Sequence, residues 1–376
     1  MNVVHIIIGL EVGGAELMLK RLVDSQQEHS EWKHTIVSLS SLGKVGEQLR
    51  IGGHEVLALG VRSSAGVPLV LWKLTRFLHQ RRPDIVQTWM YHADLLGGLA
   101  ARMAGSCSIV WNIRSTAIPQ GAWSVTYWIV RLCAICSYFI PDQIICCANA
   151  AKTAHVKLRY AADKMTVIPN GYDFSAFELD LKSKIRGRLE LGFNDGDIVI
   201  GVVGRFDPLK DFHNFVTAAS LVAAKRGNVK FLMVGRGNEW SNATLRGWIE
   251  SAGLVKSFHL VGQQTDVAYF LSVMDIFCLS SVNEAFPNVV VEAMAIGLPC
   301  VVTRAGDAAD ILGDDDFVVP VQDSISLADA MLQMCQLDPV DRRILGERNA
   351  RKVREKYGVE KIRRKYEEVY NEVSRK

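Results

Sequence analysis

Short apolar runs recur along the chain, and segments of helical character separate them. The runs do not alternate between apolar and polar residues, as a strand with one face in water does. Continuous apolar runs of this length are typical of strands in a parallel sheet that is covered on both faces. The clearest are residues 85–88, 143–147, 198–203, 230–234 and 300–303. The pattern predicts a doubly wound α/β fold, with ligands at the carboxyl ends of the strands.

The chain is too long for one ordinary domain. It has 376 residues, of which 49% are hydrophobic, enough to fill two cores. Two domains of about 150–200 residues fit the usual size range. At the end of the chain, we predict one long charged helix over residues 356–376. Its buried side would carry Tyr357, Ile362, Tyr366 and Tyr370.

Two glutamates flank an apolar stretch in the second half of the chain. Pro287 suits the first turn of a helix, where its missing N–H costs nothing, so residues 286–289 should form a helix entrance. The free amides there and the positive end of the helix dipole would bind a phosphate. Glu292 could accept hydrogen bonds from the vicinal hydroxyls of a ribose, and Glu284 from sugar hydroxyls. The alternative is that both glutamates are solvated surface charges.

Two cations follow the apolar run at residues 198–203. Arg205 and Lys210 lie just past its end, before a predicted helix. A guanidinium suits the forked geometry of phosphate oxygens, and an ammonium acts as a point charge. The pair could neutralise a pyrophosphate and stabilise it as it leaves. The alternative is that both side chains face solvent, as most loop cations do.

Gly13 and Gly14 follow the first apolar run, residues 3–8. Because they lack side chains, the backbone can approach a ligand, and the helix start behind them offers N–H groups. The glycines at positions 9, 13 and 14 do not have the G-x-G-x-x-G spacing of a dinucleotide fold. This spacing argues against an NAD-dependent enzyme.

The eight cysteines are expected to be reduced thiols. Cys133 and Cys136 lie in a predicted helix, and Cys146 and Cys147 in a predicted buried strand, where adjacent side chains point to opposite faces. We therefore expect no metal there, and the acidic triplet at residues 314–316 is expected to be a turn before a strand. The first residues lack a basic region, so no signal peptide is expected.

Several of these segments resemble, in the same order along the chain, motifs of the retaining glycosyltransferases of family 4. Residues 284–303 resemble the glutamate-pair motif, residues 13–16 the glycine loop, and residues 167–173 the interdomain hinge. Residues 201–206 with Lys210 resemble the strand and basic loop that hold the donor pyrophosphate.

The resemblance implies the GT-B fold, in which two doubly wound, Rossmann-like parallel-sheet domains face each other across a cleft. Residues 1–170 would form an acceptor-binding domain, and residues 171–355 a nucleotide-sugar-binding domain. Residues 356–376 would form a helix that crosses back to the first domain.

The resemblance also assigns roles to residues. It implies that His92 touches the transferred sugar and steadies charge at the reacting carbon. The implied catalytic residues are His92, Arg205, Lys210 and Glu284. The implied donor-binding residues are Gly14, Arg205, Lys210, Glu284, Phe286, Pro287, Asn288, Val289 and Glu292. Gly13, Gly14 and Arg114 are assigned to the acceptor, with donor phosphate as an alternative partner of Arg114.

Three positions depart from the family pattern. Asp211 and Ala285 stand where glycine is usual, and Asp310 stands where glutamate is common. Ala285 adds a methyl group near the donor sugar and could tune which sugar fits. The cations and the glutamate pair are all retained.

The implied reaction is metal-independent hexosyl transfer with retention of configuration. The donor would be a nucleotide sugar, with UDP favoured over GDP, and no cofactor is required. We expect the acceptor to be a polyprenyl-diphosphate-linked saccharide in capsule, O-antigen or exopolysaccharide synthesis. Two alternatives remain: a retaining transferase with a small soluble acceptor, and a nucleotide-sugar epimerase of the same fold.

Charge is distributed unevenly. Residues 1–170 hold 17 Lys and Arg against 11 Asp and Glu, whereas residues 171–376 hold 26 against 29. In the basic half, residues 123–139 are dense in aromatic and apolar side chains but too few to span a bilayer. They predict either a surface helix that dips into lipid headgroups or a core helix of the first domain. We expect a cytoplasmic protein, peripheral on the inner membrane face, that binds no nucleic acid.

Overall fold

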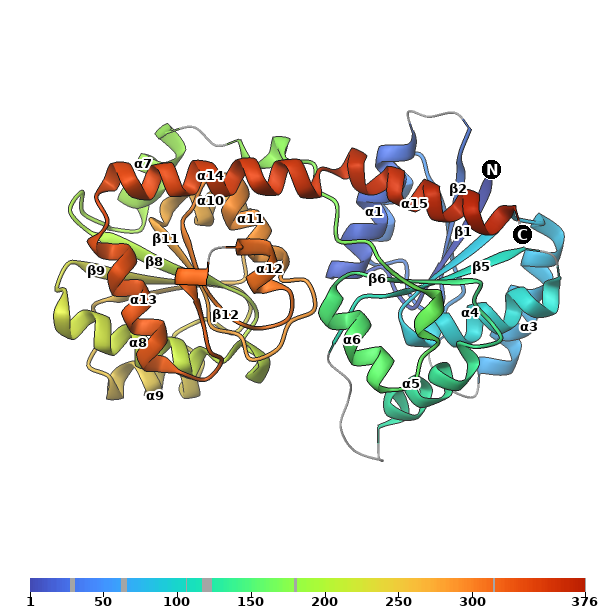
Figure 1. Cartoon of the computed structure of the whole chain (residues 1–376), viewed down its shortest axis with the longest axis horizontal. Helices are drawn as coiled ribbons and strands as arrows, with labels where there is room; N and C mark the ends of the chain where they lie inside the picture. Colours follow the sequence, from blue (N-terminus) through green and yellow to red (C-terminus); the bar gives the residue numbers. More distant parts are fainter. Residues whose placement is uncertain are drawn as a thin grey trace. The chain divides into compact units, whose positions relative to one another are not determined.

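The chain forms two compact units in the computed structural model (Figure 1). The structure describes residues 1–27, 31–61, 66–105, 107–116, 124–178, 181–313 and 315–375. Unit 1 comprises Met1–Asp173 and Tyr357–Lys376, and unit 2 comprises Phe174–Lys356. Each unit is a parallel sheet with helices on both faces, which confirms the predicted doubly wound α/β architecture.

The sheet of unit 1 begins at its centre. Its order among the described residues is β3-β2-β1-β4-β5-β6-β7, so the chain winds outward first in one direction and then in the other. The strands are β1 (Asn2–Ile7), β2 (Lys33–Ser38), β3 (Glu55–Ala58), β4 (Ile85–Trp89), β5 (Ser108–Ile113), β6 (Gln143–Cys146) and β7 (Met165–Val167). Every residue of β4 is buried, as the continuous apolar pattern predicts for a central strand.

Helices cover both faces of this sheet (Figure 1). They are α1 (Gly14–Gln27), α2 (Gly43–Ile51), α3 (Val67–Arg81), α4 (Tyr91–Ala104), α5 (Val125–Cys136), α6 (Asn149–Lys157), the short 3-10 turn η2 (Ala162–Lys164) and α15 (Val359–Ser374). Figure 1 shows α1 and α15 on one face and α3, α4 and α5 on the other. Ile362, Tyr366 and Tyr370 of α15 belong to the same core as residues of α1 and the central strands.

The predicted helix over residues 356–376 is wrong at its start. Tyr357 ends the preceding helix α14 (Pro339–Tyr357), and α15 begins at Val359. Gly358 between them is extended, with φ −56° and ψ 135°, and forms a parallel β-bridge with Tyr172. Because glycine favours helix weakly, this backbone pairing interrupts the helix. The side chains predicted to be buried are buried.

The sheet of unit 2 has the order β10-β9-β8-β11-β12-β13 among the described residues. The strands are β8 (Ile198–Val203), β9 (Val229–Val234), β10 (Phe258–Gly262), β11 (Ile276–Leu279), β12 (Cys300–Thr303) and β13 (Val318–Val319). The order reverses between β8 and β11, and open α/β sheets bind ligands beside such a switch point. The loops that follow β8 and β11 are therefore the first place to look for a site.

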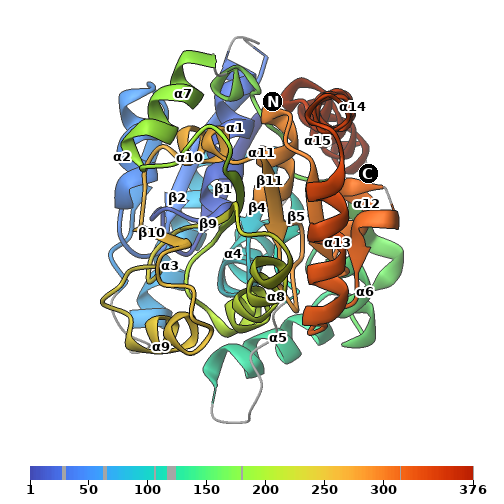
Figure 2. The ribbon, with the colours of Figure 1, turned by 90° about the vertical axis from the view of Figure 1, so that its left-hand side faces the viewer.

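The helices of unit 2 alternate with these strands. They are α7 (Leu181–Glu190), α8 (Phe212–Lys225), α9 (Ala243–Ser251), α10 (Val267–Val273), α11 (Asn288–Ile296), α12 (Ala308–Leu312), α13 (Ser324–Gln336) and α14, with 3-10 turns η3 (Ser175–Phe177), η4 (Pro208–Lys210) and η5 (Asp315–Phe317). Helices α8 and α13 pack side by side (Figure 2). Helix α11 ends at Gly297, whose φ of +91° suits glycine, and Pro299 follows before β12.

The aromatic stretch predicted at residues 123–139 contains α5, and Trp123 lies outside the described residues. Val130, Cys133 and Ala134 are buried, whereas Val125, Trp128, Leu132 and Ile135 are exposed. One side of α5 therefore packs in the core of unit 1, and the predicted contact of this helix with lipid headgroups stays a prediction. No helix within the described ranges combines the length and apolarity that crossing a bilayer requires.

Cys133, Cys136 and Cys146 lie in the predicted elements, whereas Cys147, which was predicted in the strand, follows the end of β6. Cys133 and Cys136 are in α5, Cys146 ends β6, and all eight cysteines are free thiols. Among the described residues, no three His, Cys, Asp or Glu side chains form a group suited to a metal ion. Of the acidic triplet, Asp314 lies outside those residues, and the other two begin the turn η5 before β13.

Candidate active site

Lys210 and Glu284 meet at the carboxyl edge of the unit 2 sheet. Lys210 ends η4 in the loop after β8, and Glu284 lies in the loop after β11. Lys210 Nζ is 2.6 Å from Glu284 Oε1, and Ser281 Oγ donates to the same oxygen at 2.7 Å. The lysine side chain is 23% exposed and the glutamate side chain 13%. Two predicted site residues, 74 positions apart, are thus in direct contact at a partly desolvated position.

Hydrogen bonds to backbone carbonyls hold these two loops together. Val282 N–H donates to the carbonyl of Leu209 at 2.9 Å, and Ser280 Oγ donates to the carbonyl of Lys210 at 2.7 Å. On the other side, a Cβ at Gly306 would lie 2.2 Å from the carbonyl of Glu284, and its φ is +56°. The position of the glutamate therefore depends on close backbone packing, which only glycine permits there.

Arg205 lies at the exposed rim of the same loop. Its side chain is 61% exposed, and its Nε donates to Asp207 Oδ2 at 2.9 Å. Asp207 also accepts from Leu209 N–H and so caps η4. Partial burial raises the pKa of Asp207, but the Leu209 hydrogen bond and the Arg205 guanidinium outweigh it and lower the pKa overall. Asp207, which the sequence analysis did not single out, thus orients the predicted arginine.

Asp211 explains one departure from the family pattern. Its backbone is left-handed, with φ +46° and ψ 53°, and glycine adopts that conformation without strain. Aspartate is among the few other residues that visit it. Its carboxylate also accepts from Asn214 N–H at 3.3 Å and caps α8. The substitution therefore preserves the turn that presents Lys210.

The predicted helix entrance forms one residue later than expected. Pro287 is the residue before α11 rather than part of its first turn, because its ψ of 91° is extended. Phe286 and Pro287 are buried, and Asn288 and Val289 are half-buried in the first turn. Glu292 lies one turn further along α11 and is half-buried. The element thus places a helix N-terminus and two glutamates on consecutive segments, as the sequence indicated.

In unit 1, Gly14 begins α1 and Gly13 precedes it. A Cβ at Gly13 would lie 2.3 Å from Glu16 Oε2, so the glutamate side chain folds over this glycine. Burial raises the pKa of Glu16. This half-buried carboxylate is a candidate site residue that the sequence analysis did not name, although it belongs to the glycine loop, residues 13–16.

His92 lies in the first turn of α4, directly after β4. It lines a cavity of about 530 Å³ whose other walls are mostly apolar, among them Leu39, Val70 and Leu96. Burial lowers the pKa of His92, which favours the neutral imidazole. Met90 before it has a φ of +71°, a strained conformation for a residue with a side chain. Nothing in the residue pattern predicted this conformation.

Asp94 lies one turn after Tyr91 at the base of the same helix and is fully buried. Thr88 Oγ1 donates to its Oδ1 at 2.6 Å. Burial raises the pKa of Asp94 to about 7. A carboxyl group that titrates near neutral pH therefore supports the helix that carries His92.

Arg114 belongs to a network inside unit 1. Its guanidinium donates to Asn112 Oδ1 at 2.9 Å, to the hydroxyl of Tyr366 at 3.1 Å and to Asn170 Oδ1. It also lies over the ring of Trp89, 5.5 Å from the centroid. These contacts join β5 to α15 and to the segment after β7. The predicted contact of Arg114 with a ligand stays a prediction.

Two family models match this chain. The model of Glycosyltransferase Family 4 matches residues 12–176, and the model of Glycosyl transferases group 1 matches residues 197–336. Together they cover most of both units.

Two curated bacterial proteins are similar in sequence. The UDP-Gal:alpha-D-GlcNAc-diphosphoundecaprenol alpha-1,3-galactosyltransferase of Escherichia coli is 29% identical over 278 residues, 70% of this chain and 69% of that protein. The capsular polysaccharide biosynthesis glycosyltransferase CapM of Staphylococcus aureus is 26% identical over 312 residues, 80% of each.

Solved structures share the fold over nearly the whole chain. Anabaena HepE in complex with UDP has a TM-score of 0.86 at 20% identity and covers 99% of this chain and 100% of its own. WaaG, a glycosyltransferase involved in lipopolysaccharide biosynthesis, has a TM-score of 0.73 at 15% identity and covers 98% and 99%. The two Rossmann-like sheets are therefore those of the GT-B fold.

Proposed function

The chain is a member of glycosyltransferase family 4, and we propose that it transfers a sugar from a UDP-sugar to a hydroxyl group of a lipid-linked saccharide. The observation that carries this proposal is the contact between Lys210 and Glu284 beside the switch point of the unit 2 sheet. The Lys210 ammonium suits the diphosphate of such a donor, and the Glu284 carboxylate suits the hydroxyl groups of its sugar.

The donor is proposed to bind in unit 2. Its diphosphate would lie against the N-terminus of α11 and the Lys210 ammonium. The exposed Arg205 side chain would leave Asp207 and bind the diphosphate as well. The ribose hydroxyls would bind Glu292 on α11. The complexes of Anabaena HepE with UDP and with UDP-glucose support uracil as the base.

Binding of the diphosphate would rearrange the Lys210–Glu284 pair. Lys210 Nζ would turn to the phosphate oxygens, and Glu284 would exchange the ammonium for sugar hydroxyls while Ser281 keeps it in place. Because both groups are already partly desolvated, their electrostatic interaction with the donor is stronger than in water.

The proposed reaction retains the configuration of the sugar. The bond between the anomeric carbon and the phosphate oxygen breaks, and the acceptor oxygen bonds to that carbon on the same face. The proton of the acceptor hydroxyl passes to the departing phosphate oxygen. Lys210 and Arg205 would stabilise the negative charge of the leaving diphosphate without requiring a metal ion. Neutral His92 would contact the transferred sugar.

The acceptor is proposed to bind in unit 1. The cavity beside His92 is too apolar for a saccharide alone, but it suits the non-polar part of a lipid-linked one. The Escherichia coli relative supports this acceptor class, since its name specifies a diphosphoundecaprenol-linked sugar. Gly14 at the start of α1 is exposed and would leave room for polar groups of the acceptor, whereas the Glu16 side chain covers Gly13.

A transfer assay tests the proposal. Purified protein is incubated with radiolabelled UDP-sugars and a synthetic lipid-diphosphate-linked sugar, and the product linkage is read by NMR. We expect an elongated lipid product with an α linkage from an α-linked donor. A UDP-sugar that epimerises without acceptor would contradict the proposal and favour the epimerase alternative, and transfer to free sugars alone would favour a soluble acceptor.

A further inference from the structure

Met90 joins the end of β4 to the start of α4 in a conformation that residues with side chains rarely adopt. Its φ is +71° and its ψ is 160°, a combination that is nearly confined to glycine. Such a conformation persists only where the surrounding structure holds it, and it occurs mainly at functional sites. His92, which lines the apolar cavity of unit 1, follows two residues later. The contacts that hold Met90 therefore also bear on the position of His92.

Hydrogen bonds tie the turn at Met90 to two neighbouring strands. The N–H of Met90 donates to the carbonyl of Asn112 on β5 at 3.0 Å, and its carbonyl accepts from the N–H of Asp94 at 2.9 Å. The Asp94 side chain is fully buried, and its Oδ1 accepts from Thr88 Oγ1 on β4 at 2.6 Å. The first turn of α4 is thus fixed to the sheet at both of its ends.

Tyr91 fixes the same turn to two helices. Its hydroxyl lies 3.0 Å from Nε2 of His155 on α6, and the two rings stack with their centroids 5.6 Å apart. Its carbonyl accepts from Cys133 Sγ on α5 at 3.4 Å. Tyr91 and His155 are both buried. The residue directly before His92 is therefore held by α5 and α6 as well as by its own helix.

The direction of the bond between Tyr91 and His155 follows from the surroundings of the imidazole. Its Nδ1 lies 2.7 Å from the carbonyl of Ala151, which can only accept, so Nδ1 carries the hydrogen. Burial lowers the pKa of His155, which favours the neutral ring. Nε2 therefore accepts from the hydroxyl of Tyr91. Loss of that hydroxyl would leave a buried acceptor without its donor, which is unfavourable.

We propose that Tyr91 and Asp94 are positioning residues, which hold the strained turn at Met90 and so keep His92 at the wall of the cavity. Relaxation of Met90 to a negative φ would rotate the chain that follows it and would displace His92. The inference deepens the proposed function, in which His92 contacts the transferred sugar, and it rests on that function for its effect on turnover. The position of His92 can be measured without turnover.

The test follows the His92 ring by NMR in full-length protein with ¹³C-labelled histidine, and His92→Gln identifies the resonance. In the wild type, burial lowers the pKa of His92. In Tyr91→Phe the turn should relax, the resonance should shift, and the pKa should rise toward that of an exposed histidine, about 6.5. The kcat of transfer should fall at least about tenfold, with UDP binding unchanged. Thr88→Val, which removes the donor to Asp94, should act in the same direction.

Met90→Gly tests whether strain connects these contacts to His92. Glycine adopts a positive φ without strain, so the turn in this variant does not depend on Tyr91. In Met90→Gly/Tyr91→Phe the His92 resonance should return to its wild-type position, and kcat to within about threefold of the wild type. Met90→Gly should also resist urea better than Met90→Ala. At an ordinary position of a helix or strand the order is the reverse, because glycine loses more conformational entropy on folding.

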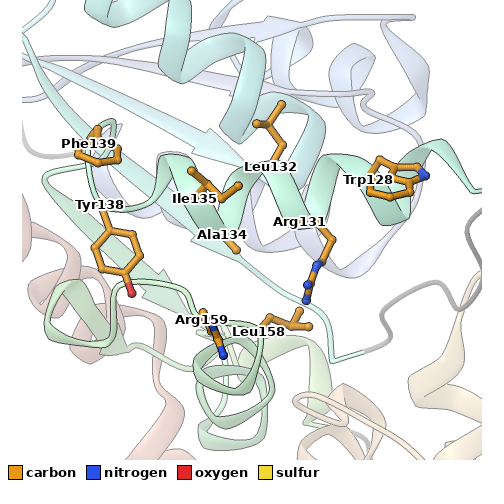
Figure 3. A pocket seen from close by; sticks show the side chains of 9 residues that line it. All are labelled: Trp128, Arg131, Leu132, Ala134, Ile135, Tyr138, Phe139, Leu158 and Arg159. Atoms are coloured by element: carbon orange, nitrogen blue, oxygen red, sulfur yellow. The ribbon is translucent and has the colours of Figure 1, made fainter.

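Two control variants separate the positioning of His92 from a general loss of packing. Tyr160→Phe removes another buried hydroxyl beside His155, one that donates to the carbonyl of Val130 at 3.1 Å. Ile135→Ser changes the exposed side of α5, where Ile135 lines a groove of about 770 Å³ between this helix and the segment after α6 (Figure 3). Both variants should leave the His92 resonance and its pKa as in the wild type.

Three results would overturn the inference. The His92 resonance could stay unchanged in both Tyr91→Phe and Thr88→Val, the Met90→Gly background could fail to restore it, or Tyr160→Phe could displace it as far as Tyr91→Phe does. A different result separates this inference from the proposed function. If the resonance responds as expected but no protein, the wild type included, transfers a sugar, the positioning of His92 stands and the proposed function fails.

Discussion

The loops of unit 2 and the cavity of unit 1 occupy equivalent places in similar folds but carry opposite chemistry. Both follow central strands of a parallel sheet, β8 and β11 in one unit and β4 in the other. In unit 2, backbone hydrogen bonds hold an ammonium against a carboxylate. In unit 1, apolar side chains surround a single imidazole. The fold thus positions both candidate sites, and the loop residues determine the chemistry of each.

This difference predicts that the two units fail in different ways when altered. Changes in unit 2 should act on the donor and on leaving-group charge. Changes in unit 1 should act on the acceptor and on the helix that carries His92. A unit 2 variant that affects only the acceptor, or a unit 1 variant that affects only the donor, would contradict this comparison.

The largest effect is expected from Lys210→Met. It removes the cation proposed to stabilise the leaving diphosphate and leaves Glu284 without its ammonium partner. Loss of one such electrostatic group lowers turnover by about 10²–10³. Steady-state kinetics measures it, with Lys225→Met as the control because that lysine side chain is 64% exposed. Turnover within about threefold of the wild type would remove Lys210 from the mechanism.

Asp94→Asn should change how stability depends on pH. The folded protein holds the Asp94 proton up to about pH 7, whereas the unfolded chain loses it near about pH 4. The folded state therefore binds more protons between these values, and the wild type should lose stability as pH rises from about 4 to about 7.

Asparagine keeps the acceptor for Thr88 but does not ionise, so the variant should lack this contribution, which is up to about 4 kcal/mol. Urea unfolding at pH 4.5, 6 and 7.5 measures the difference, with donor binding as a check on unit 2. Parallel pH profiles for the two proteins would show that Asp94 is already ionised in the fold.

Leu96→Trp should narrow the cavity beside His92. If the cavity holds the non-polar part of the acceptor, the variant should lower kcat/KM for the lipid-linked acceptor by about 30-fold and leave UDP binding unchanged, since roughly 2 kcal/mol of apolar contact is lost. Leu69→Trp adds the same bulk at a position that is 55% exposed and serves as the control. An equal loss with both variants would argue against an acceptor cavity.

The smallest effect is expected at Asp211. Asp211→Ala loses the cap of α8 and places a Cβ-bearing residue without local hydrogen bonding at φ +46°, so it should destabilise by about 1–2 kcal/mol. Asp211→Gly loses the cap but relieves the backbone strain. It should lower the free energy of unfolding by only about a few tenths of a kcal/mol. Chemical denaturation gives both values. The reverse order would mean that the left-handed turn is not what the aspartate preserves.

The sequence was sufficient to predict the sheets and to name two residues that lie together, Lys210 and Glu284. Continuous apolar runs such as Ile198–Val203 became buried parallel strands, because both of their faces meet helices. The family motifs assigned Lys210 and Glu284 to the same site, and their direct contact became visible only in the structure.

Features that depend on packing could not be predicted. The break at Gly358 arises from pairing with Tyr172, 186 positions earlier in the chain. The pKa of Asp94 is raised by burial, which depends on packing in the folded chain. For α5, the periodicity of apolar residues shows only that the helix has two different sides. The packing of α5 against α4 determines which side of the helix meets the core.

The most direct test of the donor site is calorimetric titration with UDP and UDP-glucose of the wild type, Glu292→Gln, Glu284→Gln and the exposed control Glu250→Gln. Glu292→Gln should weaken UDP itself by at least about tenfold, because a charged hydrogen bond to the ribose is lost. Glu284→Gln should leave UDP unchanged and remove only the additional affinity of the sugar. If Glu292→Gln binds UDP as the wild type and the control do, the nucleotide does not lie on α11, and the account of unit 2 is wrong.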